Sequence, residues 1–258
     1  MRPTETLRLI AQASGDIFTV SEVAIVLGIS QEDASKSLSR WAHQGLVIRL
    51  RQGLYSLFSL DSMNPEQPLE NMWILVPKIF DPGYVGGWSA AEYWDFTEQI
   101  FRDICVFTEK ENPPKKQEVL GIRYSVSHVS HKANFGTEIV WIKSKQVHVS
   151  DPHKTIIDML NNPIHGGGIQ HTIDCVKEYI KSKHFNPLRL IMYAKKMGNG
   201  AIFKRMGYLS EHILGKEHEL TLIGREEITK GASYMDPANK EGKFVRRWNL
   251  YVPDHLQI

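Results

Sequence analysis

The segment WAHQGLVIRLRQGLYSL, residues 41–57, changes its structural pattern twice. Gly45 stands where a helix is expected to end, because glycine readily adopts the left-handed conformation of a helix C-terminus. Residues 46–50 then alternate between apolar and solvent-facing positions, as in a half-buried strand. Arg51, Gln52 and Gly53 supply a turn, and residues 54–58 return as a second strand. The segment therefore predicts a helix that ends directly before a short hairpin.

Two helices are predicted upstream of this segment. Residues 3–14 carry apolar side chains at helical spacing and end at the Ser14-Gly15-Asp16 turn. Thr19 and Glu22 have the spacing of a capping box, which predicts a second helix that ends at Gly28.

A third helix follows after a short turn that contains glycine. Ser30 is its predicted N-cap, and Ala34, Leu38 and Trp41 fall on one apolar stripe. A short glycine-containing turn between two helices is typical of a helix-turn-helix. Together with the hairpin, residues 1–60 are predicted to form a winged helix-turn-helix, whose third helix enters the DNA major groove while the hairpin lies over the adjacent backbone.

The charge distribution supports DNA as the partner of this region. Residues 1–60 hold six Lys/Arg and five Asp/Glu, yet residues 36–51 contain only cationic and neutral side chains. Cations gathered in the part that meets phosphate are the expected footprint of a DNA-binding surface. The predicted DNA-binding residues are Ser35, Lys36, Ser39, Arg40, His43, Arg49, Arg51 and Gln52. The alternative is a protein-contact module whose basic residues are merely solvated.

The remainder of the chain is predicted to be a linker and a larger α+β domain. Residues 61–72 are polar, contain two prolines and lack periodicity, which indicates a linker. Residues 73–258 combine strand-like and helical segments, which predicts a small, mostly antiparallel sheet followed by a helical bundle. Strands are predicted at residues 103–108, 121–129, 137–142, 145–149, 219–223 and 244–253; helices are predicted at residues 69–80, 87–96, 150–160, 168–182, 187–197 and 200–215.

The helical part of the second domain is strongly basic. Residues 181–216 contain eight Lys/Arg and one carboxylate, Glu211. Such a surface suits an acidic partner, either protein or nucleic acid, although a solvated face is the plain alternative. The candidate partner-binding residues are Lys195, Lys196, Lys204 and Arg205.

No catalytic motif and no cofactor or metal site is recognisable in the sequence. The phosphate-binding, nucleophile-elbow and HExxH patterns are all missing. The glycine-rich segment HGGGIQH, residues 165–171, is interpreted as a flexible connector rather than an anion cradle, because no lysine or strand accompanies it. The order acid–acid–lysine of some metal-dependent nucleases occurs, in a cramped spacing, at Asp236, Glu241 and Lys243. A metal-dependent DNA-acting enzyme is therefore one alternative function. A ligand-responsive transcriptional regulator is another.

Composition places further limits on the class of protein. The chain has 258 residues, a net charge of +2 and two distant cysteines, Cys105 and Cys175, which excludes a disulfide framework or a CxxC pair. No apolar run is long enough to span a bilayer, and the first residues lack the apolar core of a signal peptide. We therefore expect a cytoplasmic protein that does not contact membranes.

Four segments together resemble a known family. They are RQGLYSL (51–57), YVGGWSAAEYWDFTEQ (84–99), VHVSDPHKTIIDML (147–160) and AIFKRMGYLSEHIL (201–214). The order is similar to the AbiEi antitoxins of type IV toxin–antitoxin systems, and the central two segments are the more specific. The resemblance implies a non-enzymatic autorepressor that acts through its N-terminal domain. It also implies that the C-terminal domain neutralises a nucleotidyltransferase-like toxin from the same operon.

Overall fold

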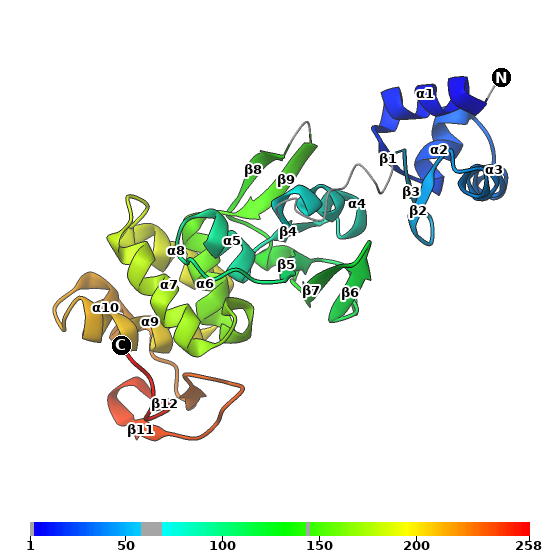
Figure 1. Ribbon diagram of the computed structural model, residues 1–258. Helices are drawn as coiled ribbons and strands as arrows, with labels where there is room; N and C mark the ends of the chain where they lie inside the picture. The colour runs from blue at the N-terminus through cyan, green and yellow to red at the C-terminus, as the bar shows by residue number, and fades with distance from the viewer. Residues whose placement is uncertain (1–2, 58–68, 143–144) are drawn as a thin grey trace.

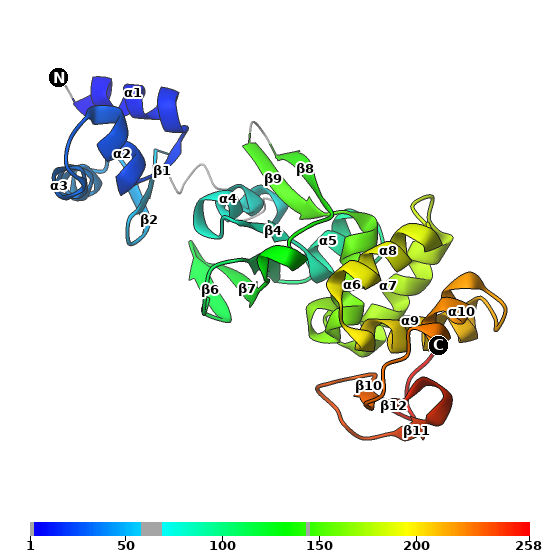
Figure 2. The same ribbon diagram turned by 180° about the vertical axis from the view of Figure 1, so that it is seen from behind.

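The computed structural model describes residues 3–57, 69–142 and 145–258. A helical N-terminal region lies at one end, a sheet occupies the middle, and a helical bundle forms the other end (Figure 1). The view from behind shows the same order and places the last strands beside the bundle (Figure 2). The predicted fold class, a winged helix-turn-helix followed by a larger α+β region, is confirmed.

The N-terminal region forms the elements that the local sequence signals predict. It contains α1 (Pro3–Ser14), β1 (Ile17–Thr19), α2 (Val20–Leu27), α3 (Gln31–His43), β2 (Ile48–Arg51) and β3 (Leu54–Ser56). The Thr19–Glu22 capping box is present, and Gly28 ends α2 in the left-handed conformation. Ser30 caps α3 by accepting a hydrogen bond from the backbone N–H of Asp33. Strand β1 was not predicted, and it pairs with β3 in a sheet of order β1-β3-β2.

Both faces of this small sheet are covered. Phe18 and Tyr55 pack inward against the buried stripe of the helices. Ile17, Leu50 and Leu54 share a hydrophobic cluster with residues of the second region instead. The winged helix is therefore packed onto the rest of the protein through the outer face of its sheet.

The central sheet has six strands in the order β6-β7-β5-β4-β9-β8. Its strands are β4 (Gly83–Val85), β5 (Asp103–Thr108), β6 (Lys116–Val119), β7 (Ile122–His128), β8 (Thr137–Ile142) and β9 (Lys145–Ser150). The β5–β7 and β4–β9 pairs are parallel, and the other three pairs are antiparallel. The sheet is thus mostly antiparallel, as predicted, although β4 and β6 were not foreseen.

Different elements cover the two faces of the central sheet. The 3-10 helix η2 (Leu69–Leu75) and α4 (Val76–Ile79) pack against one face, where they contact the cluster that contains Val106 of β5 and Val126 of β7. α5 (Gly87–Tyr93) and α6 (Pro152–Asn161) lie on the other side, where α6 approaches Tyr84. Residues 69–72 of the predicted linker form the start of η2, and residues 61–68 lie outside the described part of the chain.

The C-terminal region is a helical bundle with a small sheet. Its elements are η4 (Pro163–Gly166), α7 (Ile169–Lys181), α8 (Pro187–Met197), α9 (Gly200–Ile213), α10 (Glu219–Glu226), β10 (Ser233–Tyr234), β11 (Lys243–Val245), η5 (Arg246–Trp248) and β12 (Leu250–Val252). The strand predicted at residues 219–223 is wrong, because this segment begins α10 with His218 as its N-cap. Its β-branched content suggested a strand, but Leu220 and Gly224 lie one helical turn apart on the buried side.

Candidate nucleic-acid interface

One side of α3 is buried and the opposite side is exposed. Ala34, Leu38 and Trp41 enter the core of the winged helix, as the apolar stripe predicts. The five predicted DNA-binding residues of this helix are all exposed: Ser35, Lys36, Ser39, Arg40 and His43. A polar, cationic helix face that packs against nothing is the arrangement required of a helix that enters the major groove.

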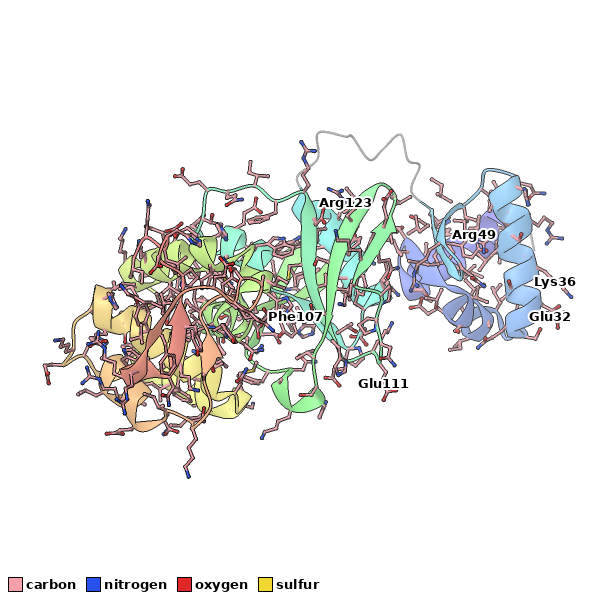
Figure 3. All side chains as sticks on the ribbon, turned by 90° about the horizontal axis from the view of Figure 1, so that it is seen from below. Glu32, Lys36, Arg49, Phe107, Glu111 and Arg123 are labelled. Atoms are coloured by element: carbon pink, nitrogen blue, oxygen red, sulfur yellow. The ribbon has the colours of Figure 1, made fainter. Side chains whose placement is uncertain are left out.

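An ion pair on α3 was not predicted from the sequence. Glu32 forms an ion pair with Lys36 at 2.7 Å, and both side chains are largely exposed. Both project from α3 away from the central sheet (Figure 3). An exposed pair of this kind contributes little to stability, so the ammonium of Lys36 can exchange Glu32 for a phosphate at small cost. The spacing of Glu32 and Lys36, one helical turn apart, was a signal available in the sequence.

The end of α3 and the hairpin enclose an open depression of about 380 Å³. Ser39 and His43 line it from α3, and Arg49 lines it from β2. Three of the predicted DNA-binding residues, taken from two elements, are therefore brought together. Arg49 thus places a cation beside the exposed face of α3. If α3 lies in the DNA major groove, this is where a phosphate at the edge of that groove would lie.

The two arginines of the hairpin have different environments. Arg49 and Gln52 are exposed, whereas Arg51 is partly buried. The Nε atom of Arg51 is shielded from solvent and has no hydrogen-bond partner. Burial lowers the pKa of Lys110 in the second region, and the positive charge of Arg51 lowers it further, while the charge of Asp81 acts in the opposite direction. A register shift between Arg49 and Arg51 accounts for their separation.

An ion pair links the winged helix to the second region. Lys78 of α4 donates to a carboxylate oxygen of Glu22 in α2. Although partial burial acts in the opposite direction, hydrogen bonds from Lys78 and from the backbone of Thr19 hold the pKa of Glu22 below its ordinary value. The same glutamate thus caps α2 and connects two regions.

The expectation that Lys204 and Arg205 lie on an exposed basic face is wrong. Their exposed fractions are only 1% and 3%. The ammonium of Lys204 donates to the carbonyl of Gly231 and to Ser233. The guanidinium of Arg205 donates to the carbonyls of Leu160 (2.7 Å), Asn161 (3.0 Å) and Tyr234 (2.7 Å). Burial lowers the pKa of Arg205 to about 10, still high enough to keep the group charged at neutral pH.

The other two candidate partner-binding residues are exposed on α8. Lys195 forms an ion pair with Glu227 of the loop after α10 at 2.9 Å. The ammonium of Lys196 lies 4.1 Å from the ring centroid of Phe135. Both cations already have intramolecular partners, although their exposure leaves them accessible.

The segment VSDPHKTIIDML forms a buried polar network at α6. The ammonium of Lys154 donates to Asp158 and, at 2.7 Å, to the hydroxyl of Tyr84, which itself donates to Asp158 at 2.9 Å. Burial lowers the pKa of Lys154, while the carboxylate of Asp158 acts in the opposite direction. All polar groups of the trio have partners inside the protein, so this network holds α6 on β4.

A second candidate site is an open groove of about 910 Å³ above β5 and β7. Ser125 and Ser127 line its floor, His165 and Trp88 stand on one wall, and the loop around Glu111 forms the other. Glu111 and Arg123 mark opposite ends of this part of the sheet (Figure 3). Burial and the charge of Lys154 lower the pKa of His165 below its ordinary value of 6.5, while the carboxylate of Asp158 acts in the opposite direction. No sequence pattern indicates this groove, because its residues come from distant segments.

The glycine-rich segment lies beside this groove and connects η4 to α7, consistent with a connector between helices. A side chain at Gly166 would meet Thr172, so the segment packs closely there. Asp236, one of the nuclease-like acids, accepts a backbone hydrogen bond from Ala238. Within residues 3–57, 69–142 and 145–258, no three His, Cys, Asp or Glu side chains are grouped as metal ligands.

Comparison with solved structures gives chains of similar fold. The chain aligns with the crystal structure of the RV2827C protein from Mycobacterium tuberculosis at a TM-score of 0.59 and 14% identity. The alignment covers 98% of this chain and 92% of that one, so the likeness extends over both regions. At this identity it shows the fold alone.

Comparison by sequence is informative for the N-terminal region. Curated proteins gave no match. In the described residues, no helix combines the length and apolar character required to cross a membrane. A family model described as "Transcriptional regulator, AbiEi antitoxin" matches residues 5–57, which supports a regulator or antitoxin role. The winged helix of this chain therefore matches the AbiEi antitoxin family of transcriptional regulators.

Proposed function

We propose that this protein binds double-stranded operator DNA through its winged helix and represses its own operon. We further propose that its second region neutralises a nucleotidyltransferase-like toxin encoded in that operon. The observation that carries the first part is the exposed face of α3, on which Ser35, Lys36, Ser39, Arg40 and His43 lie opposite a fully packed apolar stripe. The family match over residues 5–57 supports the same assignment.

The proposed roles on α3 and the hairpin follow from residue type and position. Lys36 and Arg40 reach base edges or phosphates in the major groove, because long cationic side chains pair with guanine and with the DNA backbone. Ser35, Ser39 and His43 supply shorter hydrogen-bonding contacts. Arg49 and Gln52 contact the adjacent backbone. Arg51, which is partly buried, contributes mainly through long-range charge.

Operator binding is tested by replacing Lys36 and Arg40 with alanine. Loss of a bidentate base contact should weaken binding to the promoter DNA of the protein's own gene by roughly 1–3 kcal/mol. Binding by the unchanged protein should also weaken with added salt, because phosphate contacts release counterions. The measurement is fluorescence anisotropy at several salt concentrations.

The chain offers a matched control for this experiment. Lys181 on α7 is also 69% exposed and also forms an ion pair with a neighbouring glutamate, at 2.7 Å. Together with exposed Arg246, its replacement by alanine removes two cations far from α3. If the Lys181→Ala, Arg246→Ala protein loses as much affinity as the α3 variant, binding depends on net charge and the assignment to α3 fails.

The antitoxin role is assigned to the second region, with Lys195 and Lys196 as the accessible cations of α8. Reversing both charges to glutamate should abolish protection from the toxin if the toxin meets this face, because like charges then oppose association. Growth rescue and a promoter reporter are measured together. Normal protection by the reversed variant, with normal repression, would remove α8 from the proposal and leave the DNA-binding assignment intact.

A ligand-responsive regulator is the second candidate function, and the groove above β5 and β7 favours it. The groove has the volume of a small-molecule site, and Trp88 and Ile164 give it apolar surface among mostly polar and charged lining residues, so it is suited to a polar small molecule. A ligand that binds there should raise the melting temperature and change operator affinity in the same titration. Replacing Ser127 by tryptophan would fill the floor and abolish both effects.

A further inference from the structure

The two edges of the central sheet differ in how they meet solvent. The β6 edge is short, and its outward side chains Lys116 and Glu118 are charged. Charged side chains on a short edge strand are a common protection against pairing with another chain. The β8 edge is longer and carries two large apolar side chains, Ile139 and Trp141, with exposed fractions of 51% and 62%. The β8 edge thus has the features that an interface requires.

Ile139 and Trp141 lie on the same face of β8, because they are two residues apart. The intervening Val140 and the following Ile142 face the opposite side, against the cluster that contains η2. In the described part of the chain, β9 pairs with one side of β8, and no strand pairs with the other. The unpaired backbone of β8 and its exposed side chains therefore lie along one continuous border.

We propose that β8 is a homodimer interface, in which the β8 strands of two copies pair antiparallel about a two-fold axis at Val140. This register places Ile139 of each copy opposite Trp141 of the other. It therefore forms two symmetric aromatic–aliphatic pairs, which stabilise antiparallel strands. A two-fold interface uses the same patch on both copies, as this strand does.

On the other face of β8, the side chains that lie side by side across the paired strands are compatible as well. Within one copy, Val140 pairs with Val147 and Ile142 pairs with Lys145. The dimer extends these rows, so Val140 meets its own symmetry mate and two valine pairs form one apolar row. Glu138 of one copy then faces Ile142 of the other and shares a row with the second copy's Lys145. The only carboxylate of β8 thus meets an apolar residue and a cation, and no like charges are opposed.

The dimer is expected to be weak in solution. Pairing through one short strand buries less than the about 1,000 Å² typical of stable interfaces. Lys145 lies against Gly15 of the winged helix, so pairing through β8 also fixes the separation of the two winged helices. The inference concerns self-association alone and does not depend on DNA binding.

Sedimentation velocity of the full chain over a hundredfold range of concentration tests the inference. The unchanged protein should shift from monomer toward dimer as concentration rises. The double variant Ile139→Lys, Trp141→Lys should remain monomeric, because lysine on an edge strand opposes pairing and both positions are exposed. Leu188→Lys on α8, at a 68% exposed leucine, is the control and should dimerise normally. An unchanged protein that stays monomeric throughout, or a lysine variant that dimerises normally, would overturn the proposal.

Disulfide trapping tests the register. Cysteine in place of Val140 lies on the two-fold axis and should form a covalent dimer under mild oxidation. Cysteine in place of Glu138 should not, because its symmetry mate lies several residues away along the strand. The natural cysteines, Cys105 and Cys175, are buried and do not interfere. Equal trapping at both positions, or trapping at Glu138→Cys alone, would overturn the register.

Discussion

Helices α3 and α9 both carry a pair of long cationic side chains, yet they place them in opposite environments. Lys36 and Arg40 of α3 are exposed, while Lys204 and Arg205 of α9 are almost fully buried. On α3, the buried residues fall on one stripe. On α9, every residue from Ile202 to Glu211 is buried, because α6, α10 and the C-terminal strands surround the helix. A count of charges along the sequence is therefore not a measure of surface charge.

The difference can be read in the neighbouring residues. Polar side chains accompany the cations of α3, whereas Phe203 and Met206 flank those of α9 on both sides. A helix with apolar residues on all sides is buried in a core. Cations in such a helix must find acceptors inside the protein, as Arg205 does at three backbone carbonyls. The periodicity around a charge thus decides whether it is available to a partner.

The largest difference in stability is expected between two lysine–carboxylate pairs of equal spacing. Lys154–Asp158 is buried, whereas Glu32–Lys36 is exposed, and each pair spans one helical turn. Asp158→Ala should lower the free energy of unfolding by about 3–5 kcal/mol, because it leaves the buried ammonium of Lys154 without its counter-ion. Glu32→Ala should change it by less than about 0.5 kcal/mol. Urea denaturation measures both, and a similar loss in the two variants would contradict the contrast.

A second test compares two arginines. Arg205→Ala removes donors from three backbone carbonyls and creates a cavity, so the free energy of unfolding should fall by about 2–4 kcal/mol. Arg40→Ala should leave stability within about 0.5 kcal/mol and affect only DNA affinity. Chemical denaturation of both proteins, together with the anisotropy assay, separates the two roles. Retained stability in Arg205→Ala would show that water replaces the guanidinium.

The winged helix was predictable because its signals are local. A capping box at Thr19, an N-cap at Ser30 and left-handed glycines at positions 28, 45 and 53 each fix one boundary without reference to distant residues. Strand β1 escaped prediction because three residues are too few to show alternation. The contact of the outer face of this sheet with the second region was also not predicted, since nothing in residues 17–54 indicates such a partner.

The second region depends more on distant contacts. Strand β4 is three residues long and is held between β5 and β9, which are far from it in sequence. Residues 219–223 have β-branched side chains, but packing against α9 makes them helical. The floor of the groove and its His165 wall come from segments about 40 residues apart, and only folding brings them together. The sequence therefore predicted the order of elements better than the candidate sites of this region.

Acid should destabilise the second region through Glu211. This carboxylate accepts hydrogen bonds from Trp248 (2.7 Å) and Arg225 (3.0 Å). Although desolvation acts in the opposite direction, these donors and the charge of Arg247 hold its pKa below the ordinary value of 4.5. A lowered carboxyl pKa stabilises the folded state at neutral pH, and that contribution is lost as the pH falls below about 4.5. Melting temperatures between pH 7 and pH 3 should fall less steeply in Glu211→Gln, and an identical slope in both proteins would contradict this assignment.

The smallest effect is expected at the contact between the two regions. Lys78→Ala removes only the ion pair to Glu22. Because the side chains of Lys78 and Glu22 are 26% and 33% exposed, the free energy of unfolding should fall by only about 0.2–1 kcal/mol. Glu22→Ala should lower the free energy of unfolding by about 0.5–2 kcal/mol, because the same carboxylate also completes the capping box of α2.

Glu22→Gln is the sharper variant, since glutamine can keep the cap while it removes the charge. If the ion pair alone matters, Glu22→Gln should match Lys78→Ala, and added salt should reduce the difference between each variant and the unchanged protein. A loss several times larger in Lys78→Ala would mean that its side chain also supports the apolar contact of Ile17 and Leu54, which would make the winged helix less separable than the local signals suggest.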